Sequence, residues 1–197
     1  LMEYCMSYNR LEIYRFLHTC IVYDINNVIN ISKILSIKYK IYCKGEYLID
    51  HVLYCARCDS IDILNYLINT YKIKKSKLLS HYYYRYTIQY VLCMGNLSIM
   101  KILHNRLHLT YKDFINCKVD KTQHSIVGNI QKAPMYLNYP YVLMNIAVYG
   151  KIESLEYLVS IGLPLQYIQK RLSLILPIII CSDNYTFMKY LVDLGIS

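Results

Sequence analysis

The feature that most constrains the fold of this chain is an internal repeat. Five segments superpose without gaps: "SYNRLEIYRFLHT", "RCDSIDILNYLIN", "CMGNLSIMKILHN", "VYGKIESLEYLVS" and, shifted by one residue, "SDNYTFMKYLVDL". One column holds residue types that tolerate a left-handed backbone, namely Asn9, Asp59, Gly95, Gly150 and Asn184. A second column closes the segments with Leu17, Leu67, Leu103, Leu158 and Leu191. The chain is therefore expected to repeat one small structural unit.

Each segment has the pattern of a helix that follows a tight turn. Apolar residues between the two columns keep i, i+3, i+4 spacing, as Ile13, Phe16 and Leu17 do. A slim side chain precedes each turn and belongs to an earlier helix; this column reads Met6, Ala56, Leu92, Ala147 and Cys181. The sequence predicts an all-α fold of about five helix-turn-helix units.

Two insertions interrupt the array. The closing leucines are separated by 50, 36, 55 and 33 residues, so the first and third intervals carry additional chain. We place the additions at 21–46 and 118–140. The second has the Gly and Pro content of a loop, whereas the first has enough apolar periodicity for a short helix or a degenerate repeat.

These units resemble the ankyrin-repeat family. The run "AVYGKIESLEYLVSIGLP" carries the family pattern A-x-x-G-x-L/I-E-x-x-x-Y-L-V-x-x-G, and "NYTFMKYLVDLGIS" repeats its second half. The interval of 33 residues equals the ankyrin period. No unit carries the T-P-L-H opening of the family. The repeat sequences are most similar to the divergent arrays of large DNA viruses, first to mimivirus-like and then to poxvirus-like arrays.

The resemblance implies an ankyrin-like solenoid over 1–197, with units ending near 20, 70, 106, 161 and 197. Because the chain opens on Leu1 and stops after a second helix, we expect it to be part of a longer array or to self-associate through uncapped ends. The family implies a non-catalytic scaffold that binds a protein, here a host or viral one. The alternatives are a structural component of a virion or large assembly and a basic nucleic-acid-associated protein.

The composition and the N-terminal segment predict the cellular compartment of the protein. Eight cysteines without a recognisable secretion signal predict reduced thiols in the cytoplasm, either of a host cell or in a virion. No window has the roughly 18 to 20 apolar residues that a membrane span needs. The net charge of +9 favours acidic partners without choosing among protein, nucleic acid and lipid.

Cys55-x-x-Cys58 raises the question of a metal site, a redox pair or two packed thiols. Cys55 shares a column with Cys5, Val91, Ile146 and Ile180, which favours a small apolar seat on the inner face of a helix. A structural zinc site needs four ligands, and only Cys43 and His51 lie near in sequence. We predict packed thiols and no metal.

The remaining chemical candidates are weaker. His104 and His108 lie one helical turn apart at an expected helix end, where histidine complements the helix dipole. Glu46, Asp50 and His51 fit a solvated helix surface. The six glycines are scattered singly, and no catalytic constellation is traceable, so we predict neither an enzyme nor a cofactor.

The segment "YKIKKSKLLSHYYYRY" is the candidate partner-binding surface. It connects the second unit to the third and contains Lys72, Lys74, Lys75, Lys77, Tyr82, Tyr83, Tyr84 and Arg85. Tyrosine and arginine are favoured interface anchors, and the same mixture can stack on bases and neutralise phosphates. The competing interpretation is a solvated lysine turn before a helix whose tyrosines are partly core.

Overall fold

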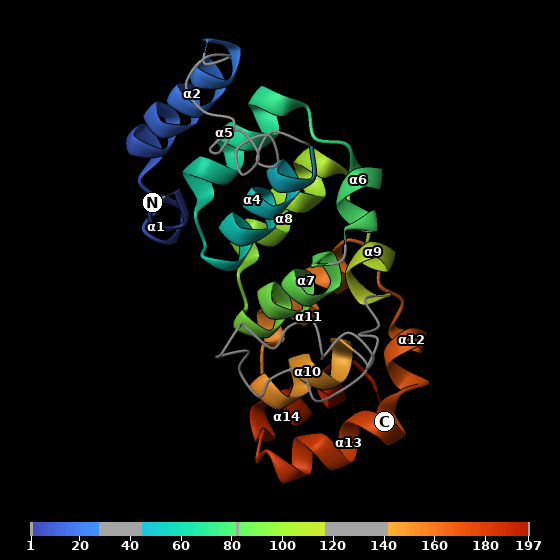
Figure 1. Ribbon diagram of the computed structural model, residues 1–197. Helices are drawn as coiled ribbons and strands as arrows, with labels where there is room; N and C mark the ends of the chain where they lie inside the picture. Colours follow the sequence, from blue (N-terminus) through green and yellow to red (C-terminus); the bar gives the residue numbers. More distant parts are fainter. Residues whose placement is uncertain (1, 28–44, 82, 117–141, 197) are drawn as a thin grey trace, which may run out of the picture. The chain divides into compact units, whose positions relative to one another are not determined.

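The computed structural model describes residues 2–27, 45–81, 83–116 and 142–196, and every regular element in these ranges is a helix (Figure 1). The predicted all-α class is confirmed for this part of the chain. None of the described helices combines the length and the apolar character that crossing a membrane requires.

The chain divides into two compact units, Leu1–Thr87 and Ile88–Ser197. The first contains α1 (Met2–Ser7), α2 (Leu11–Asn27), α4 (Gly45–Arg57), α5 (Ile61–Tyr71) and α6 (Lys75–Ser80). The second contains α8 (Leu97–Leu107), α9 (Tyr111–Ile115), α10 (Val142–Tyr149), α11 (Ile152–Ser160), α12 (Leu165–Gln169), α13 (Leu172–Cys181) and α14 (Tyr185–Asp193). The boundary falls within α7 (Tyr84–Met94).

Five turns between paired helices share one backbone geometry. Each contains a residue with φ between 50° and 72°: Asn9, Asp59, Gly95, Gly150 and Asp183. The N–H after this residue donates to the carbonyl five positions earlier, in Arg10–Cys5, Ser60–Cys55, Asn96–Val91, Lys151–Ile146 and Asn184–Ile179, at 2.8–3.1 Å. This hydrogen bond of a left-handed helix end satisfies carbonyls that the first helix leaves open. The five turns are thus structural equivalents, and we call the positive-φ residue of each the turn residue.

The last turn corrects the sequence alignment by one residue. Asp183, with φ 54°, is the turn residue, whereas Asn184 was predicted. Consequently Ile179, and not Ile180, occupies the column of Cys55, and Ile180 replaces Cys181 in the slim-residue column. Asp and Asn both tolerate the left-handed conformation, so the sequence "DN" left the choice open. The Asn184 side chain instead donates to the carbonyls of Ala147 and Val148 at 2.8 and 2.7 Å.

A second left-handed position follows the second helix and leads to a short third helix. Its residues are Lys72, His108, Gly162 and Gly195. Lys72, His108 and Gly162 are each followed by a helix of five or six residues. The side chain six positions after each of them is apolar and fully buried, and it anchors this helix: Leu78 on α6, Phe114 on α9 and Ile168 on α12. Such helices are too short to show a periodic sequence pattern, so they were not predicted.

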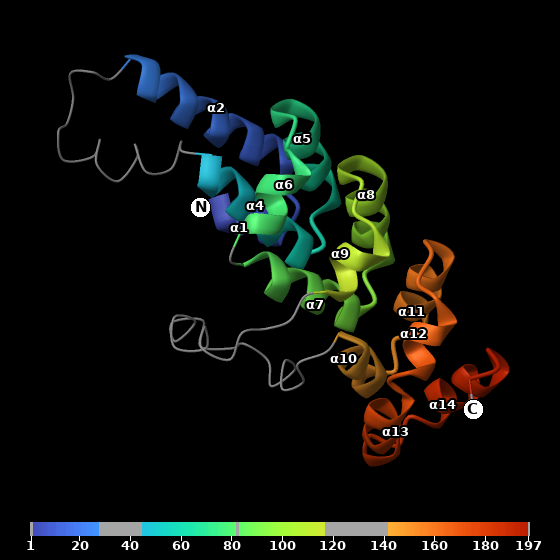
Figure 2. The ribbon, with the colours of Figure 1, turned by 90° about the vertical axis from the view of Figure 1, so that its right-hand side faces the viewer.

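Neighbouring repeats pack through their first helices and through buried polar links. In the first unit α1 packs on α2 and α4, and α5 packs on α2 and α4 (Figure 2). In the second, α10 packs on α11 and α13, and α13 on α14. The hydroxyl of Ser60 donates to the carbonyl of Met6, and that of Ser154 donates to the carbonyl of Leu92 at 2.8 Å. Both serines are fully buried, so these bonds tie each repeat to the one before it.

The insertions predicted at 21–46 and 118–140 are described only in part. Residues 21–27 extend α2, which therefore continues well beyond the unit end expected near 20. Residues 45 and 46 begin α4. The stretches 28–44 and 118–140 lie outside the described residues.

Alanine substitution at Gly150 and at Gly195 should distinguish the energetic cost of a left-handed backbone from the cost of a steric clash. A Cβ on Gly150 (φ +60°) would lie 3.0 Å from Asn184 Oδ1, whereas one on Gly195 (φ +76°) meets nothing within 4 Å. We expect Gly195→Ala to lower the free energy of unfolding by about 1 kcal/mol, the cost of the left-handed backbone, and Gly150→Ala to lower it by about 2 kcal/mol. Urea unfolding followed by circular dichroism measures both. Equal losses of unfolding free energy in the two variants would show that the Asn184 side chain does not crowd a Cβ at position 150.

Candidate interaction surface

The predicted lysine-tyrosine segment forms the end of α5, the short helix α6 and the start of α7. Lys72 is the left-handed residue that ends α5, and Lys74 precedes α6 with extended backbone. Leu78 is fully buried and holds α6 against the core. The segment is therefore a helical connection fixed at one point.

The side chains of this segment divide into exposed and core residues. Lys72, Lys74, Lys77 and Arg85 are exposed, and Lys75 and Tyr83 are half-buried. Tyr84 is only 3% exposed and is a core residue, so it is removed from the predicted surface. The first turn of α7 directs this side chain inward because the helix packs on one face. Tyr82 lies outside the described residues. The surface that remains is basic, with less aromatic area than predicted.

An ion pair fixes the connection between α6 and α7. His81 Nε2 lies 3.3 Å from Asp50 Oδ1 on α4, and the His81 side chain is only 7% exposed. The predicted grouping of Glu46, Asp50 and His51 on one solvated surface is therefore wrong for two of its members. Asp50 contacts His81, while His51 turns toward α2; the side chain of Glu46 is not among those described. Adjacent residues on a helix diverge by about 100°, which separates Asp50 from His51.

A buried tyrosine-histidine cluster, absent from the sequence predictions, lies between α2, α4 and α5. The Tyr14 hydroxyl is 2.7 Å from His51 Nδ1, and the Tyr71 hydroxyl is 2.9 Å from His18 Nδ1. The ring of His18 also stacks on that of Tyr14, with centroids 5.8 Å apart. Burial, and secondarily the nearby imidazole of His18, lowers the pKa of His51 to about 4; burial also lowers the pKa of His18. Burial raises the pKa of Tyr14, so burial disfavours the charged forms of Tyr14, His18 and His51 alike.

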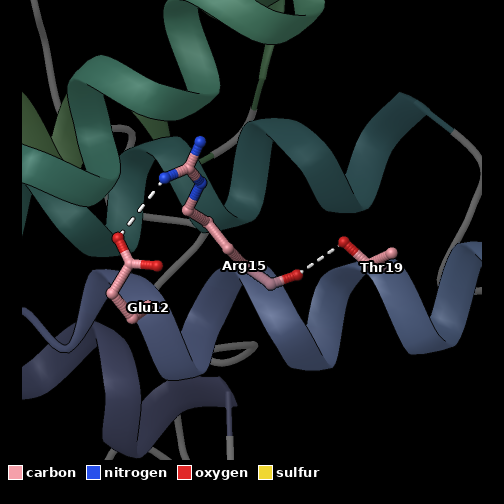
Figure 3. Close-up of polar contacts among 3 residues, drawn as sticks. All are labelled: Glu12, Arg15 and Thr19. Atoms are coloured by element: carbon pink, nitrogen blue, oxygen red, sulfur yellow. Dashed lines mark hydrogen bonds and ion pairs between the residues drawn. The ribbon is translucent and has the colours of Figure 1, made fainter.

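Glu12, Arg15 and Thr19 form a row of exposed polar side chains along α2 (Figure 3). Arg15 Nη1 lies 3.3 Å from Glu12 Oε1, and the Thr19 hydroxyl donates to the Arg15 carbonyl at 2.8 Å. The Arg15 guanidinium also lies 5.3 Å from the centre of the Tyr66 ring on α5. These contacts are exposed and therefore each contributes little to stability.

Cys55 and Cys58 are packed thiols. Cys55 is fully buried, and burial together with the nearby Cys58 raises the pKa of its thiol, which disfavours the thiolate that redox chemistry and metal binding need. Cys58 is half-buried, with its sulfur 4.0 Å from the Ser7 hydroxyl. Among the described residues no group of three or more His, Cys, Asp or Glu could hold a metal ion.

His104 and His108 belong to the end of α8, as predicted. His108 is the left-handed residue that follows α8, and His104 Nδ1 donates to the Leu109 carbonyl at 2.6 Å. The two imidazoles therefore have separate backbone roles. The sequence analysis did not identify the left-handed position that His108 shares with Lys72.

The second unit continues the pattern of basic residues on short helices. Lys112 on α9 and Lys170 directly after α12 are exposed, and the Arg171 guanidinium stacks 3.6 Å from the centre of the Tyr167 ring. The carboxylate of Asp113 on α9 accepts hydrogen bonds from the backbone and the side chain of Thr110. The sequence pattern that could have located these short helices is an apolar residue six positions after each left-handed residue.

Comparisons of the chain with protein-family models, with curated proteins and with solved structures give no significant match. The geometry of the described residues is therefore the basis for the proposals below.

Acidification should destabilise the first unit through His51. Its folded-state pKa of about 4 lies below the usual 6.5, so the unfolded chain binds more protons between these values and stability falls as the pH is lowered through them. The loss between pH 7.5 and pH 4 should be on the order of 3 kcal/mol. Urea unfolding at a series of pH values measures it. His51→Gln should reduce the dependence of the unfolding free energy on pH between pH 7.5 and pH 4, whereas His108→Asn, at an exposed position, should leave it unchanged. The same pH dependence in the unaltered chain and in both variants would disprove the role of His51.

Proposed function

We propose that the chain is a non-catalytic scaffold of ankyrin-like repeats that binds another protein through the exposed residues of its short helices, which form a short-helix edge within each of the two units. The observation that supports this most directly is the fully buried anchor that α6, α9 and α12 have in common, namely Leu78, Phe114 and Ile168. Each anchor occupies the same position, while the helix sequences "KSKLLS", "YKDFI" and "LQYIQ" differ. Repeat proteins build binding surfaces in this way: the buried positions stay constant from repeat to repeat, and the exposed positions vary.

Spacing and turn geometry support the ankyrin-like assignment. The turn residues Gly150 and Asp183 are 33 residues apart, which is the ankyrin period. Each repeat pairs two helices around a left-handed turn, and three of the repeats lead through Lys72, His108 or Gly162 into a described connection. In this chain the connection is a short helix in place of the hairpin of a typical ankyrin repeat.

The charge of the edge suggests the chemistry of the partner. Lys72, Lys74 and Lys77 are exposed in the first unit, and Lys112 and Lys170 in the second. The nearby Asp113 is engaged by Thr110. We therefore propose an acidic protein surface as the partner, since complementary charge accelerates association and sets register. The resemblance to arrays of large DNA viruses makes a host protein in the cytoplasm the proposed target.

Binding of nucleic acid has less support. A single-strand platform needs aromatic rings that are open to the bases, but Tyr84 is buried and Tyr83 is half-buried. A role in a large assembly is taken up below, because different residues suggest it.

Charge reversal on α6 should separate partner binding from folding. We expect Lys74→Glu with Lys77→Glu to weaken partner capture by tenfold or more, which corresponds to a loss of about 1.4 kcal/mol of binding free energy. Lys101→Glu with Arg106→Glu on α8 makes the same change in net charge away from the edge and should leave capture unchanged. Quantitative mass spectrometry compares cytoplasmic extract captured by the three proteins, after circular dichroism has verified their helix content.

Two results would contradict this proposal. Equal capture by both double variants would remove the short-helix edge as the site. Capture that disappears after nuclease treatment would identify nucleic acid as the partner.

A further inference from the structure

The exposed apolar residues of the described chain are concentrated on two faces. Nine of the eleven large hydrophobic side chains that are exposed in the described chain lie on the first or the last repeat, and seven of these nine form two sets. The first set is Tyr4, Tyr8, Ile13 and Phe16, which we call the head face. The second is Ile180, Met188 and Val192, which we call the tail face.

Contacts inside each unit show which repeat positions face which neighbour. The Tyr54 hydroxyl, five residues before its turn residue, lies 3.0 Å from the Ser7 hydroxyl of the preceding repeat. The Tyr157 ring, seven residues after its turn residue, meets the His104 ring of the preceding repeat edge-on at a centroid distance of 6.2 Å. His104 itself is nine residues after its turn residue. Positions five before and seven after therefore face the preceding repeat, and position nine after faces the following one.

The head face consists of positions that face a preceding repeat. Tyr4 is five residues before the turn residue Asn9, and Phe16 is seven after it. Ile13 is four after it, and the equivalent residues Ile63, Ile99 and Phe187 are buried. The four head-face side chains are 51% to 67% exposed, and the rings of Tyr4 and Tyr8 pack on each other at 4.6 Å.

The tail face consists of positions that face a following repeat. Ile180 is equivalent to Met6, Ala56, Leu92 and Ala147, all of which are buried. Met188 is equivalent to Tyr14, Leu64, Met100 and Leu155, which are also buried. Val192 is equivalent to His104. The three tail-face side chains are 37% to 63% exposed.

We propose that a second copy of this chain docks its head face on the tail face of the first, in a head-to-tail contact. The two faces are the two halves of the repeat-repeat interface that the chain forms internally, so their apolar positions interlock in the register that α10 and α13 use. This contact does not depend on the short-helix edge or on its proposed partner.

Polar groups around the faces are compatible with this contact. Asn184, one residue after its turn residue, donates to two carbonyls of the preceding repeat. Arg10 has the same position in the first repeat and is exposed, so in the docked copy it can reach the end of α13 beside Asp183. Glu12 and Arg15, which border Phe16, neutralise each other at 3.3 Å (Figure 3). The head face therefore presents an apolar centre with a nearby cation.

Because the two faces differ, the contact is heterologous, and copies add head to tail into an open chain or, where the rotation between copies closes, into a ring. Association should therefore add copies progressively, with the average mass rising with concentration above the 23.4 kDa of one chain. Disruption of one face should stop growth without removing the other face.

Sedimentation equilibrium of single-face variants tests the proposal. Phe16→Glu removes the head face and Val192→Glu removes the tail face, and each variant alone should remain at 23.4 kDa. An equimolar mixture should form a one-to-one dimer and no larger species, because Phe16→Glu retains a tail and Val192→Glu retains a head. Leu165→Glu, which places the same charge at an exposed leucine on α12 outside both faces, should associate like the unaltered chain.

Three outcomes would overturn the proposal. The first is an unaltered chain that stays monomeric at about 100 µM, which excludes a contact of useful affinity. The second is a dimer formed by either single-face variant alone, which would indicate pairing of like faces. The third is a mixture that stays monomeric although circular dichroism shows both variants folded. In the first case a neighbouring repeat of a longer polypeptide becomes the occupant of these positions.

Discussion

The left-handed turn between paired helices is the constraint on which the rest of the structure depends. At this point the first helix ends, and the next N–H reaches back to the carbonyl of Cys5, Cys55, Val91, Ile146 or Ile179. The bond uses carbonyls that would otherwise be buried without a partner. It also brings the second helix back against the first, as α4 and α5 or α10 and α11 show, so the apolar residues of both helices can pack on a neighbouring repeat of the same unit. Without that shared turn, adjacent repeats would not pack in a common register.

Polar groups specify how the repeats pack, because apolar contact alone tolerates sliding. Ser60 and Ser154 each bond a carbonyl of the preceding repeat from a buried position. In the first unit Tyr14 and His51 add a neutral buried pair between α2 and α4. Such groups are costly to bury unless their partners are in place, so they favour one arrangement over its alternatives.

The distribution of exposed residues has two separate consequences for function. Exposed lysines lie on or beside the short helices, which supports the proposal of an acidic partner surface. The head and tail faces carry apolar residues that the repeat geometry would bury if another repeat were present. These surfaces use different side chains, so binding of a partner and association of copies can be altered independently.

The sequence by itself determined the paired helices, four of the five turn positions and the burial of Cys55, because these depend on local propensity and on a repeated pattern. Only the tertiary structure decided which tyrosines are core: Tyr84 is buried although its neighbours Tyr83 and Arg85 are not. It also placed the last turn at Asp183 and assembled the Tyr14–His51 pair from residues 37 positions apart. The physical reason is that burial and long-range hydrogen bonds depend on which helix faces meet, and a one-dimensional pattern carries that information only where neighbouring repeats are nearly identical.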